Sequence, residues 1–158
     1  MKYKYLNIGT LNVRGSRDEV KMETIAKDAA NYNLQILGIT ETHVKEESNT
    51  KIAVKSEQNI RTYNYYNGGI VEGNTYAGVG VLIDADLESK VNRVTDRICT
   101  CEVTLEEKKK ITVVVAYAPT LIRSESHPEL AGNVYEILNN TVDKVRSRNP
   151  LFVIGDFN

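Results

Sequence analysis

Three apolar runs of this sequence end abruptly in polar residues, and this pattern restricts the fold more than any other feature. Residues 34–40 read LQILGIT before ETH, residues 110–119 read KITVVVAYAP, and residues 151–155 read LFVIG before DFN. Short runs of this kind, rich in β-branched residues, are typical of strands that are covered on both faces. We therefore expect a buried sheet whose strands deliver polar groups to one edge.

The segments between these runs complete an alternation of strands and helices. Residues 18–32 and 128–147 carry apolar residues at helical spacing and predict amphipathic helices. Further strands are expected over residues 4–13, 60–67, 78–84, 89–96 and 98–107, with 60–67 as an edge or hairpin strand. Residues 45–58 predict a loop or a short helix. The alternation predicts an α/β fold.

The composition fits one domain over residues 1–158. The chain is 41% hydrophobic and 26% charged, which suits a globular domain with a sizeable core. The formal net charge of −1 excludes a binder that relies on overall positive charge. The N-terminus has no apolar core of signal-peptide length, and no run approaches the roughly 18 apolar residues of a membrane span. The simplest expectation is a soluble, intracellular protein without a membrane partner, and the oligomeric state stays open.

Two conspicuous features do not predict a ligand site. Cys99 and Cys101 lie two residues apart in an alternating stretch, so both point to the same face of a strand and are expected to stay reduced. The glycine-rich residues 68–84 lack the spacing and the terminal Lys-Ser/Thr of a phosphate-binding loop. They are predicted to form a hairpin connection followed by a strand.

Polar residues that follow four predicted strands are the candidates for chemistry: residues 12–14 (NVR), 41–43 (ETH), 117–120 (YAPT) and 156–158 (DFN). Strand ends hold ligand groups on a rigid support in α/β folds. The set contains two carboxylates, two amides and a phenol, but no Ser, Cys or Lys beside a plausible base, which argues against a covalent hydrolase. Oxygen ligands of this kind suit Mg²⁺ or Mn²⁺. The predicted reaction is a metal-assisted attack of water on a phosphodiester.

Each of these residues also has a simpler interpretation. Glu41 could cap or solvate a turn, Asn12 could be a turn amide, and Asp156 after a glycine could begin a turn. Tyr117 could be a core ring with its hydroxyl at the surface, and His43 an ordinary exposed imidazole. Only the joint placement of these residues at four strand ends supports a site.

The order of the motifs resembles the endonuclease/exonuclease/phosphatase superfamily, which has the DNase I-like fold. LNVRG, GITETH, VVVAYAPT and FVIGDFN follow one another in register over essentially the whole chain. QILGITETH, YNYYNGGIVEGNTYAGVGVLI, TDRI and AYAPT are further similar to the endonuclease domains of non-LTR retrotransposons, especially the craniofacial development protein 2-like group. The resemblance implies a DNase I-like two-sheet α/β sandwich and a DNA endonuclease that depends on Mg²⁺ or Mn²⁺.

Carried over residue by residue, the resemblance implies a role for each strand end. Glu41 is the principal metal ligand, with Asn12 beside it at the scissile phosphate. Tyr117 contacts the phosphate or the leaving group, and Asp156 orients or deprotonates the attacking water. Asn158 hydrogen-bonds the phosphate or Asp156. These roles agree with the residue chemistry, because a water bound to a metal gives up its proton more easily.

Three neighbouring residues have lesser roles or depart from the family pattern. Arg14 stands where abasic-site endonucleases have an acidic metal ligand, so its implied partner is a phosphate. Thr120 replaces an asparagine after Tyr-Ala-Pro and is a weaker candidate for a phosphate contact. His43 belongs to a recurring Glu-Thr-His and is expected to contact the metal ligand rather than the metal.

The family pattern continues beyond Gly-Asp-Phe-Asn to a Ser-Asp-His ending, and neither His43 nor His127 stands in that place. The resemblance therefore implies roughly the N-terminal half of the domain, supplying the first sheet and its helices, with an apolar sheet face left uncovered and little or no activity. The alternatives are a phosphatase or deadenylase on the same fold, and a decayed or domesticated non-catalytic fragment. The implied partners are DNA and the reverse transcriptase domain of a parent element, and the nucleus is a candidate compartment.

Overall fold

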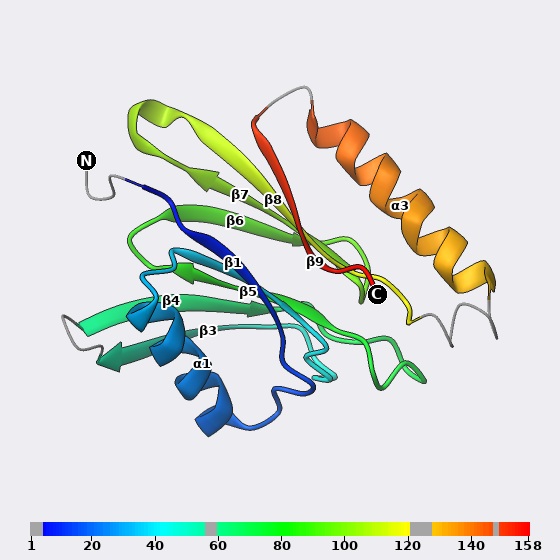
Figure 1. The fold of residues 1–158 in the computed structure, drawn as a ribbon, viewed down its shortest axis with the longest axis horizontal. Helices are drawn as coiled ribbons and strands as arrows, with labels where there is room; N and C mark the ends of the chain where they lie inside the picture. Colours follow the sequence, from blue (N-terminus) through cyan, green and yellow to red (C-terminus); the bar gives the residue numbers. More distant parts are fainter. Residues whose placement is uncertain (1–4, 56–59, 121–127, 147–148) are drawn as a thin grey trace.

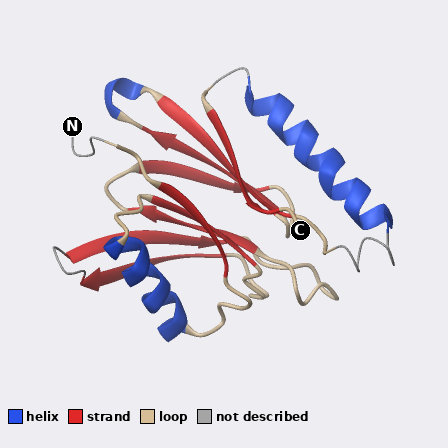
Figure 2. Ribbon diagram, in the orientation of Figure 1, coloured by secondary structure: helices blue, strands red, loops and turns tan. Residues whose placement is uncertain are grey.

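The computed structural model is a sandwich of two β-sheets with one helix on each outer side (Figure 1, Figure 2). The structure describes residues 5–55, 60–120, 128–146 and 149–158, so His127 lies outside the described residues. The layers follow the order helix, sheet, sheet, helix. This arrangement confirms the predicted DNase I-like α/β sandwich.

The first sheet has the strand order β1-β2-β5-β4-β3. Its strands are β1 (Ile8–Asn12), β2 (Ile36–Thr40), β3 (Ser48–Lys55), β4 (Ile60–Asn67) and β5 (Val79–Asp84). β1 and β2 run parallel, and the other neighbours run antiparallel. β1 therefore forms one edge of this sheet and β3 forms the other.

The second sheet has the strand order β6-β7-β8-β9. Its strands are β6 (Glu88–Arg93), β7 (Ile98–Thr104), β8 (Lys110–Tyr117) and β9 (Leu151–Asp156), with the short 3₁₀ helix η1 (Glu106–Lys108) between β7 and β8. β8 and β9 run parallel, and the helix α3 (Pro128–Arg146) lies between them in the sequence. Parallel neighbours need such a crossover.

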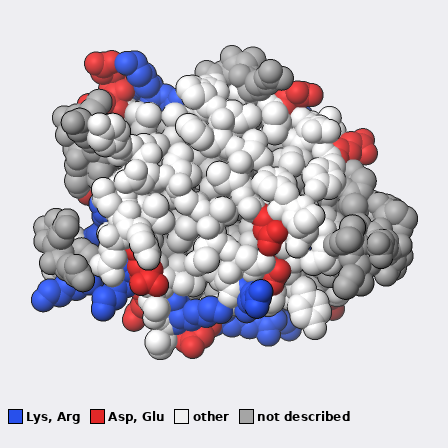
Figure 3. All heavy atoms as spheres, viewed as in Figure 1, with Lys and Arg blue, Asp and Glu red and all other residues white. Residues whose placement is uncertain are grey.

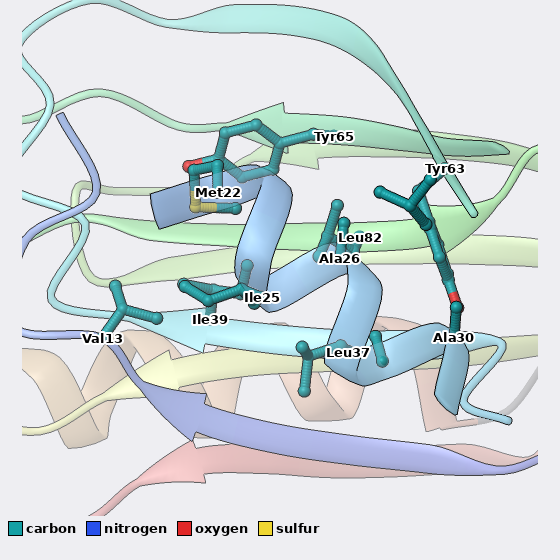
Figure 4. Packing of buried hydrophobic residues seen from close by; sticks show 12 residues of the cluster. Val13, Met22, Ile25, Ala26, Ala30, Leu37, Ile39, Tyr63, Tyr65 and Leu82 are labelled. Carbon is teal, nitrogen blue, oxygen red and sulfur yellow. The ribbon is translucent and has the colours of Figure 1, made fainter. Parts of the chain in front are cut away.

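The helix α1 (Glu19–Asn31) covers the outer face of the first sheet (Figure 4). The Asp18 side chain caps its first turn by accepting a hydrogen bond from the backbone N–H of Val20 at 2.9 Å. The buried face consists of Met22, Ile25, Ala26, Ala29 and Ala30. It packs on residues of β2, β4 and β5, namely Leu37, Ile39, Tyr63, Tyr65 and Leu82. The three alanines keep this interface thin.

Alternate residues of β8 face opposite layers. Ile111, Val113 and Val115 join the apolar cluster between the two sheets, whereas Val114 and Ala116 pack beneath α3. The cluster between the sheets also contains Ile36, Tyr66, Val79, Val81 and Ile83 from the first sheet. The expectation that the chain supplies only one sheet, with its apolar face uncovered, is therefore wrong. The strands β6 to β9 form a second sheet that buries that face.

Residues 48–55 form the strand β3 where the sequence predicts a loop or a short helix. Only Val54 is buried in this strand, with Ile52 packed partly beside it, because β3 is an edge strand whose other residues are largely in solvent. Its apolar pattern is too sparse to indicate a strand. β4 forms the predicted hairpin, but it lies inside the sheet instead of at the edge.

The two cysteines of β7 behave as predicted. Cys99 and Cys101 are both buried, and neither forms a disulfide. Burial raises the pKa of the Cys101 thiol to about 12 and also raises the pKa of Cys99. Both residues therefore serve as small apolar side chains of the core.

β1 and β9 each have one edge without a partner strand among the described residues, and the two strands contact each other across the sandwich. Large apolar side chains are exposed there: Leu11 is 42% exposed, Phe152 44% and Val153 39%. Figure 3 shows this face with few charged side chains at its centre and with Lys and Arg gathered along its lower rim. Among the described helices, none has the length and apolar character that a membrane crossing requires.

Candidate active site

The C-terminal ends of β1, β2, β8 and β9 meet at one end of the sandwich (Figure 1). Gly38 allows β2 to approach the second sheet closely, because a Cβ atom at this position would lie 2.7 Å from Cδ1 of Ile154 in β9. The two sheets therefore come together just before their strands end. As predicted, the four strand ends bring their polar groups to one place, but these groups come from two sheets and not from one edge of a single sheet.

One amide group connects two carboxylates from different sheets. Asn12 Nδ2 donates hydrogen bonds to Glu41 Oε1 at 2.8 Å and to Asp156 Oδ2 at 2.9 Å. Asn12 Oδ1 accepts a hydrogen bond from the backbone N–H of Arg14 at 3.1 Å, which orients the amide. Coordination of a cation by Asn12 Oδ1 would require this amide to turn over, whereas Glu41 already presents oxygen atoms.

Tyr117 places a buried phenol on the same carboxylate. Its hydroxyl donates a hydrogen bond to Glu41 Oε1 at 2.9 Å, and the residue is 4% exposed. Burial, together with the hydrogen bond to Glu41 and the negative charge of that carboxylate, raises the pKa of Tyr117 to about 12. The phenol therefore keeps its proton throughout the physiological pH range and acts as a hydrogen-bond donor.

Four residues at this end have left-handed backbone conformations, which side chains other than glycine adopt rarely. The φ angles are 48° for Arg14, 57° for Glu41, 55° for His43 and 45° for Asn158. The backbone N–H of Gly15 donates to the Glu41 carbonyl at 2.7 Å and helps to hold this conformation. Backbone strain of this kind, on the order of 1–3 kcal/mol per residue, persists where the surrounding structure enforces it, and it gathers at functional sites.

His43 lies beside the site rather than in it. Its Nε2 atom is 3.6 Å from Glu41 Oε2, and its ring meets the ring of Tyr76 edge-on with centroids 5.7 Å apart. Nε2 is buried and forms no hydrogen bond within the described part of the chain. The predicted contact between His43 and the metal ligand stays a prediction, which this proximity supports.

The remaining predicted residues surround the carboxylates less closely. The backbone N–H of Asn158 donates to Asp156 Oδ1 at 3.1 Å, but its side-chain Nδ2 donates to the carbonyl of Ala118 at 2.9 Å. Asn158 thus supports Asp156 through its main chain. Arg14 and Thr120 are exposed, and no described hydrogen bond joins their side chains to the site. Their phosphate contacts stay predictions.

The donor set fits a hard divalent cation that retains most of its water ligands. Within the described residues, no three His, Cys, Asp or Glu side chains form a metal-binding group. Glu41 and Asp156 make no ion pair with Lys or Arg in the same part of the chain. Mg²⁺ commonly uses only one or two carboxylates and keeps several waters. Glu41, with the amide of Asn12 beside it, satisfies that requirement.

Arg97 is the residue at this end that sequence reasoning missed. It is 5% exposed, and its guanidinium carbon lies 4.8 Å from the centroid of the Tyr117 ring. Its only signal in the sequence was its place in TDRI, one of the segments that carry the resemblance. A charged residue between two predicted strands is normally exposed, so nothing in the sequence indicated that Arg97 would lie in the site.

A comparison with family models identifies the family of this chain. Residues 9–158 match the model of the Endonuclease/Exonuclease/phosphatase family. The chain belongs to this family. No curated protein matches the chain. The family assignment agrees with the order of strand ends on which the resemblance was based.

Solved structures share the family fold at low sequence identity. AP endonuclease LMAP from Leishmania major superimposes with a TM-score of 0.67 at 12% identity, covering 93% of this chain and 53% of that chain. The catalytic domain of Xenopus laevis APE2 gives 0.61 at 15% identity, covering 96% of this chain and 58% of that chain. TDP2 from Caenorhabditis elegans gives 0.53 at 14% identity, covering 85% of this chain and 40% of that chain. The chain thus spans about half the length of the first two.

Proposed function

We propose that this chain carries the metal-binding part of a phosphodiester hydrolase that nicks DNA. The observation that carries the proposal is the pair of hydrogen bonds, 2.8 and 2.9 Å long, by which Asn12 joins Glu41 of one sheet to Asp156 of the other. Two carboxylates at one point can divide the tasks of holding a cation and of taking a proton from water. Members of this family generally depend on divalent metals, and these oxygen donors suit Mg²⁺ or Mn²⁺.

Each side chain has a distinct part in this proposal. Glu41 would hold the cation, with Asn12 beside it keeping its Nδ2 hydrogen bonds to Glu41 and Asp156. The cation when bound would supply positive charge for the phosphate and for the attacking water. Asp156, fixed through both oxygens by Asn12 Nδ2 and the backbone N–H of Asn158, orients that water and accepts its proton. Tyr117 keeps its phenol proton, and turning this single O–H from Glu41 Oε1 to a phosphate oxygen would let it donate there when substrate is bound.

Phosphate contacts at the rim complete the proposal. Arg14 carries the positive charge nearest in sequence to Asn12, and its exposure leaves the guanidinium accessible to a substrate. Thr120 follows the Tyr117 strand and is exposed at the same end, where its hydroxyl can donate to a phosphate oxygen. Asn158 contributes mainly by fixing Asp156.

The choice of DNA rests on the resemblance to retrotransposon endonucleases. The ETH and YAPT contexts at Glu41 and Tyr117 favour that group, including its craniofacial development protein 2-like members, over phosphatases or deadenylases of the same fold. A DNA-nicking function of this kind implies an intracellular, nuclear location. The reverse transcriptase domain of a parent element is the corresponding protein partner.

A plasmid-nicking assay tests the reaction. Purified protein in excess over supercoiled plasmid, with Mg²⁺, is expected to nick weakly at most, because the chain spans about half the length of the structures it matches. Any nicking should stop with EDTA and fall by at least about 10²-fold in Glu41→Gln and in Asp156→Asn. Glu19→Gln, which changes an exposed carboxylate on α1, is the matched control. Nicking that persists in the two site variants, or faster hydrolysis of poly(A) or inositol phosphates, contradicts the proposal.

Binding of Mn²⁺ tests the site even when nicking is too slow to detect. Electron paramagnetic resonance should show a bound ion whose affinity falls at least about tenfold in Glu41→Gln and is unchanged in Glu19→Gln. Thermal melts should agree for all three proteins, since Glu41 is only partly buried. If wild-type protein binds no Mn²⁺ at millimolar concentration, the metal site is wrong.

A non-catalytic function is the second candidate, and the unpaired edges of β1 and β9 favour it. A sheet edge with exposed Leu11, Phe152 and Val153 can pair with another polypeptide. A decayed or domesticated chain would retain this capacity without the reaction. Size-exclusion chromatography with light scattering discriminates here, because a clean monomer at high concentration argues against an interacting edge.

A further inference from the structure

The turn between β6 and β7 contains two charged residues that are buried. Asp96 is 8% exposed and Arg97 is 5% exposed. Charged residues in a hairpin turn normally face water, and their burial requires specific partners. Both residues find these partners at the end of the sandwich that carries the candidate active site, the catalytic end. Arg97 contacts Tyr117 of the second sheet, and Asp96 contacts the loop that leads into β5 of the first sheet.

Arg97 holds Tyr117 of the second sheet. Its carbonyl accepts a hydrogen bond from the Tyr117 backbone N–H at 2.8 Å, and its guanidinium Nη1 donates to the Tyr117 carbonyl at 3.4 Å. The same guanidinium lies over the phenol ring, with its carbon 4.8 Å from the ring centroid. A cation in this position is attracted to the ring and restricts its movement. The backbone and the ring of Tyr117 are thus both fixed by one residue.

Asp96 holds the segment that supports Glu41 of the first sheet. Its carbonyl accepts from the backbone N–H of Gly78 at 2.9 Å, and its carboxylate accepts from Asn74 Nδ2 at 2.6 Å. The Gly78 carbonyl in turn accepts from the backbone N–H of Thr42 at 3.1 Å, next to Glu41. A Cβ atom on Gly78 would lie 2.1 Å from Thr42 Oγ1, so only glycine permits this approach. Hydrogen bonds therefore lead from Asp96 to the residue beside Glu41.

These contacts form a continuous connection between the two halves of the site. Tyr117 and Glu41 meet across the sandwich in a hydrogen bond of 2.9 Å, although they belong to different sheets. Apolar packing between two sheets is non-directional, so it does not by itself align the two partners of a hydrogen bond. A polar connection at the strand ends can hold a hydrogen bond much more closely.

We propose that Asp96 and Arg97 are positioning residues that fix the Tyr117 phenol against the Glu41 carboxylate. This inference rests on the proposed function, since it gives Asp96 and Arg97 a purpose only if Glu41 and Tyr117 act together. Neither residue has to touch the substrate. Arg97 acts on the phenol through the ring and the backbone of Tyr117, and Asp96 acts on Glu41 through Gly78 and Thr42.

Amide hydrogen exchange measures this connection directly. In Arg97→Met, the Tyr117 amide should exchange at least about tenfold faster relative to the Val114 amide in the centre of β8. In Asp96→Asn, the Gly78 amide keeps its hydrogen bond to the carbonyl of residue 96, but the altered side-chain contact with Asn74 should loosen residues 74–78 and give the Gly78 amide the same selective increase. Arg97→Lys, which retains a cation near the ring, should restore part of the protection of Tyr117.

Arg61→Met is the matched control, because the Arg61 side chain is only 18% exposed and lies at the end of β4 away from the site, where it pairs with Asp84. It should speed the exchange of the Tyr117 and Val114 amides by the same factor. Unchanged relative protection of Tyr117 in Arg97→Met and of Gly78 in Asp96→Asn would overturn the proposal, as would an equal selective loss in Arg61→Met. Should Arg97→Met fail to fold, Arg97→Lys and Asp96→Asn decide the question alone.

Mn²⁺ affinity adds a readout that a purely structural role would not change. Arg97→Met and Asp96→Asn should each weaken Mn²⁺ binding several-fold, roughly three- to tenfold, while Arg61→Met leaves it unchanged. Unchanged affinity in both site variants contradicts positioning of Glu41. If wild-type protein binds no Mn²⁺, the proposed function fails, and the exchange measurements still test the connection by themselves.

Discussion

The two ends of the β-sandwich contain buried polar groups, but they use them differently. At the far end, Gln35 is fully buried, its Oε1 accepts from the backbone N–H of Asn7 at 2.7 Å, and its Nε2 donates to the Asn33 carbonyl at 2.8 Å. Arg61 pairs there with the buried Asp84 at 3.1 Å. Polar groups at this end are matched within the chain, which is the arrangement expected where they serve stability.

The catalytic end, by contrast, contains buried polar atoms without hydrogen-bond partners among the described residues. In the described part of the chain, the buried side-chain atoms without a hydrogen-bond partner all lie there: Thr40 Oγ1, Thr42 Oγ1, His43 Nε2, Asn67 Oδ1 and Asn74 Oδ1. Left-handed backbone occurs at both ends, but asparagine, as at Asn33 of the far end, tolerates this conformation better than Glu41 or His43 of the catalytic end does. Each unmatched buried group costs about 1–3 kcal/mol. The comparison indicates that the far end stabilises the fold, whereas the end that carries the candidate active site gives up stability.

The largest expected loss of stability follows substitution of Gly155, and it tests how tightly β8 and β9 pack at the catalytic end. Its φ is 144°, and a Cβ atom there would lie 1.8 Å from the carbonyl oxygen of Ala116 in the adjacent strand. Gly155→Ala must therefore separate β8 from β9, and we expect a loss of more than about 4 kcal/mol or no folded protein. Gly73→Ala is the control, because its φ is 85° but nothing lies within 4 Å. It should cost only about 1–2 kcal/mol. Equal losses in urea unfolding would contradict the packing argument.

The second-largest expected effect tests whether the far end stabilises the fold. Arg61→Met removes the cation beside Asp84, which is only 2% exposed, and should lower the free energy of unfolding by about 3–5 kcal/mol. The control at the catalytic end is Arg17→Met. The Arg17 guanidinium donates to the His43 carbonyl at 2.6 Å, but the residue is exposed, so the expected loss is about 1 kcal/mol. If the two variants lose the same stability in denaturant unfolding, the far end has no special role in stabilising the fold.

The catalytic end was largely predictable, because the signals that define it are local. Asn12, Glu41, Tyr117 and Asp156 each follow an apolar run directly, and parallel packing of strand ends then brings them together. The helix α1 also appears within one residue of its predicted limits at both ends, since Asp18 supplies a cap and the apolar spacing is regular.

What the sequence could not give depends on contacts between distant segments. Nothing in the strand patterns of β6 to β9 indicates that these strands form a sheet of their own. The structure pairs Ile98 with Ala116 and Ala116 with Gly155, and no single segment contains the information that selects these partners. Arg97 shows the same limit at the site. Arg97 is buried because the turn that contains it folds over Tyr117 of the second sheet. The sequence of a turn does not indicate which distant residues will pack against it.

The smallest expected effect concerns Tyr117 at the catalytic end, whose contribution to the free energy of unfolding depends on pH. The pKa of this phenol is raised from 10.0 to about 12 in the folded protein, first by burial and then by Glu41. The neutral phenol is thus favoured by folding, so its contribution to stability is complete below pH 10 and is lost as the pH rises from 10 through about 12.

Tyr117→Phe should cost about 1 kcal/mol at pH 7, the value of one hydrogen bond, and should lose less stability than wild type between pH 10 and pH 12. Tyr32→Phe, which changes a residue that is 78% exposed, should follow wild type throughout. Urea unfolding at pH 7, 10 and 11 measures both quantities. Parallel curves for Tyr117→Phe and wild type would mean that the phenol is not held against Glu41, and the site would then lack the hydrogen-bond donor that the proposed function assigns to it.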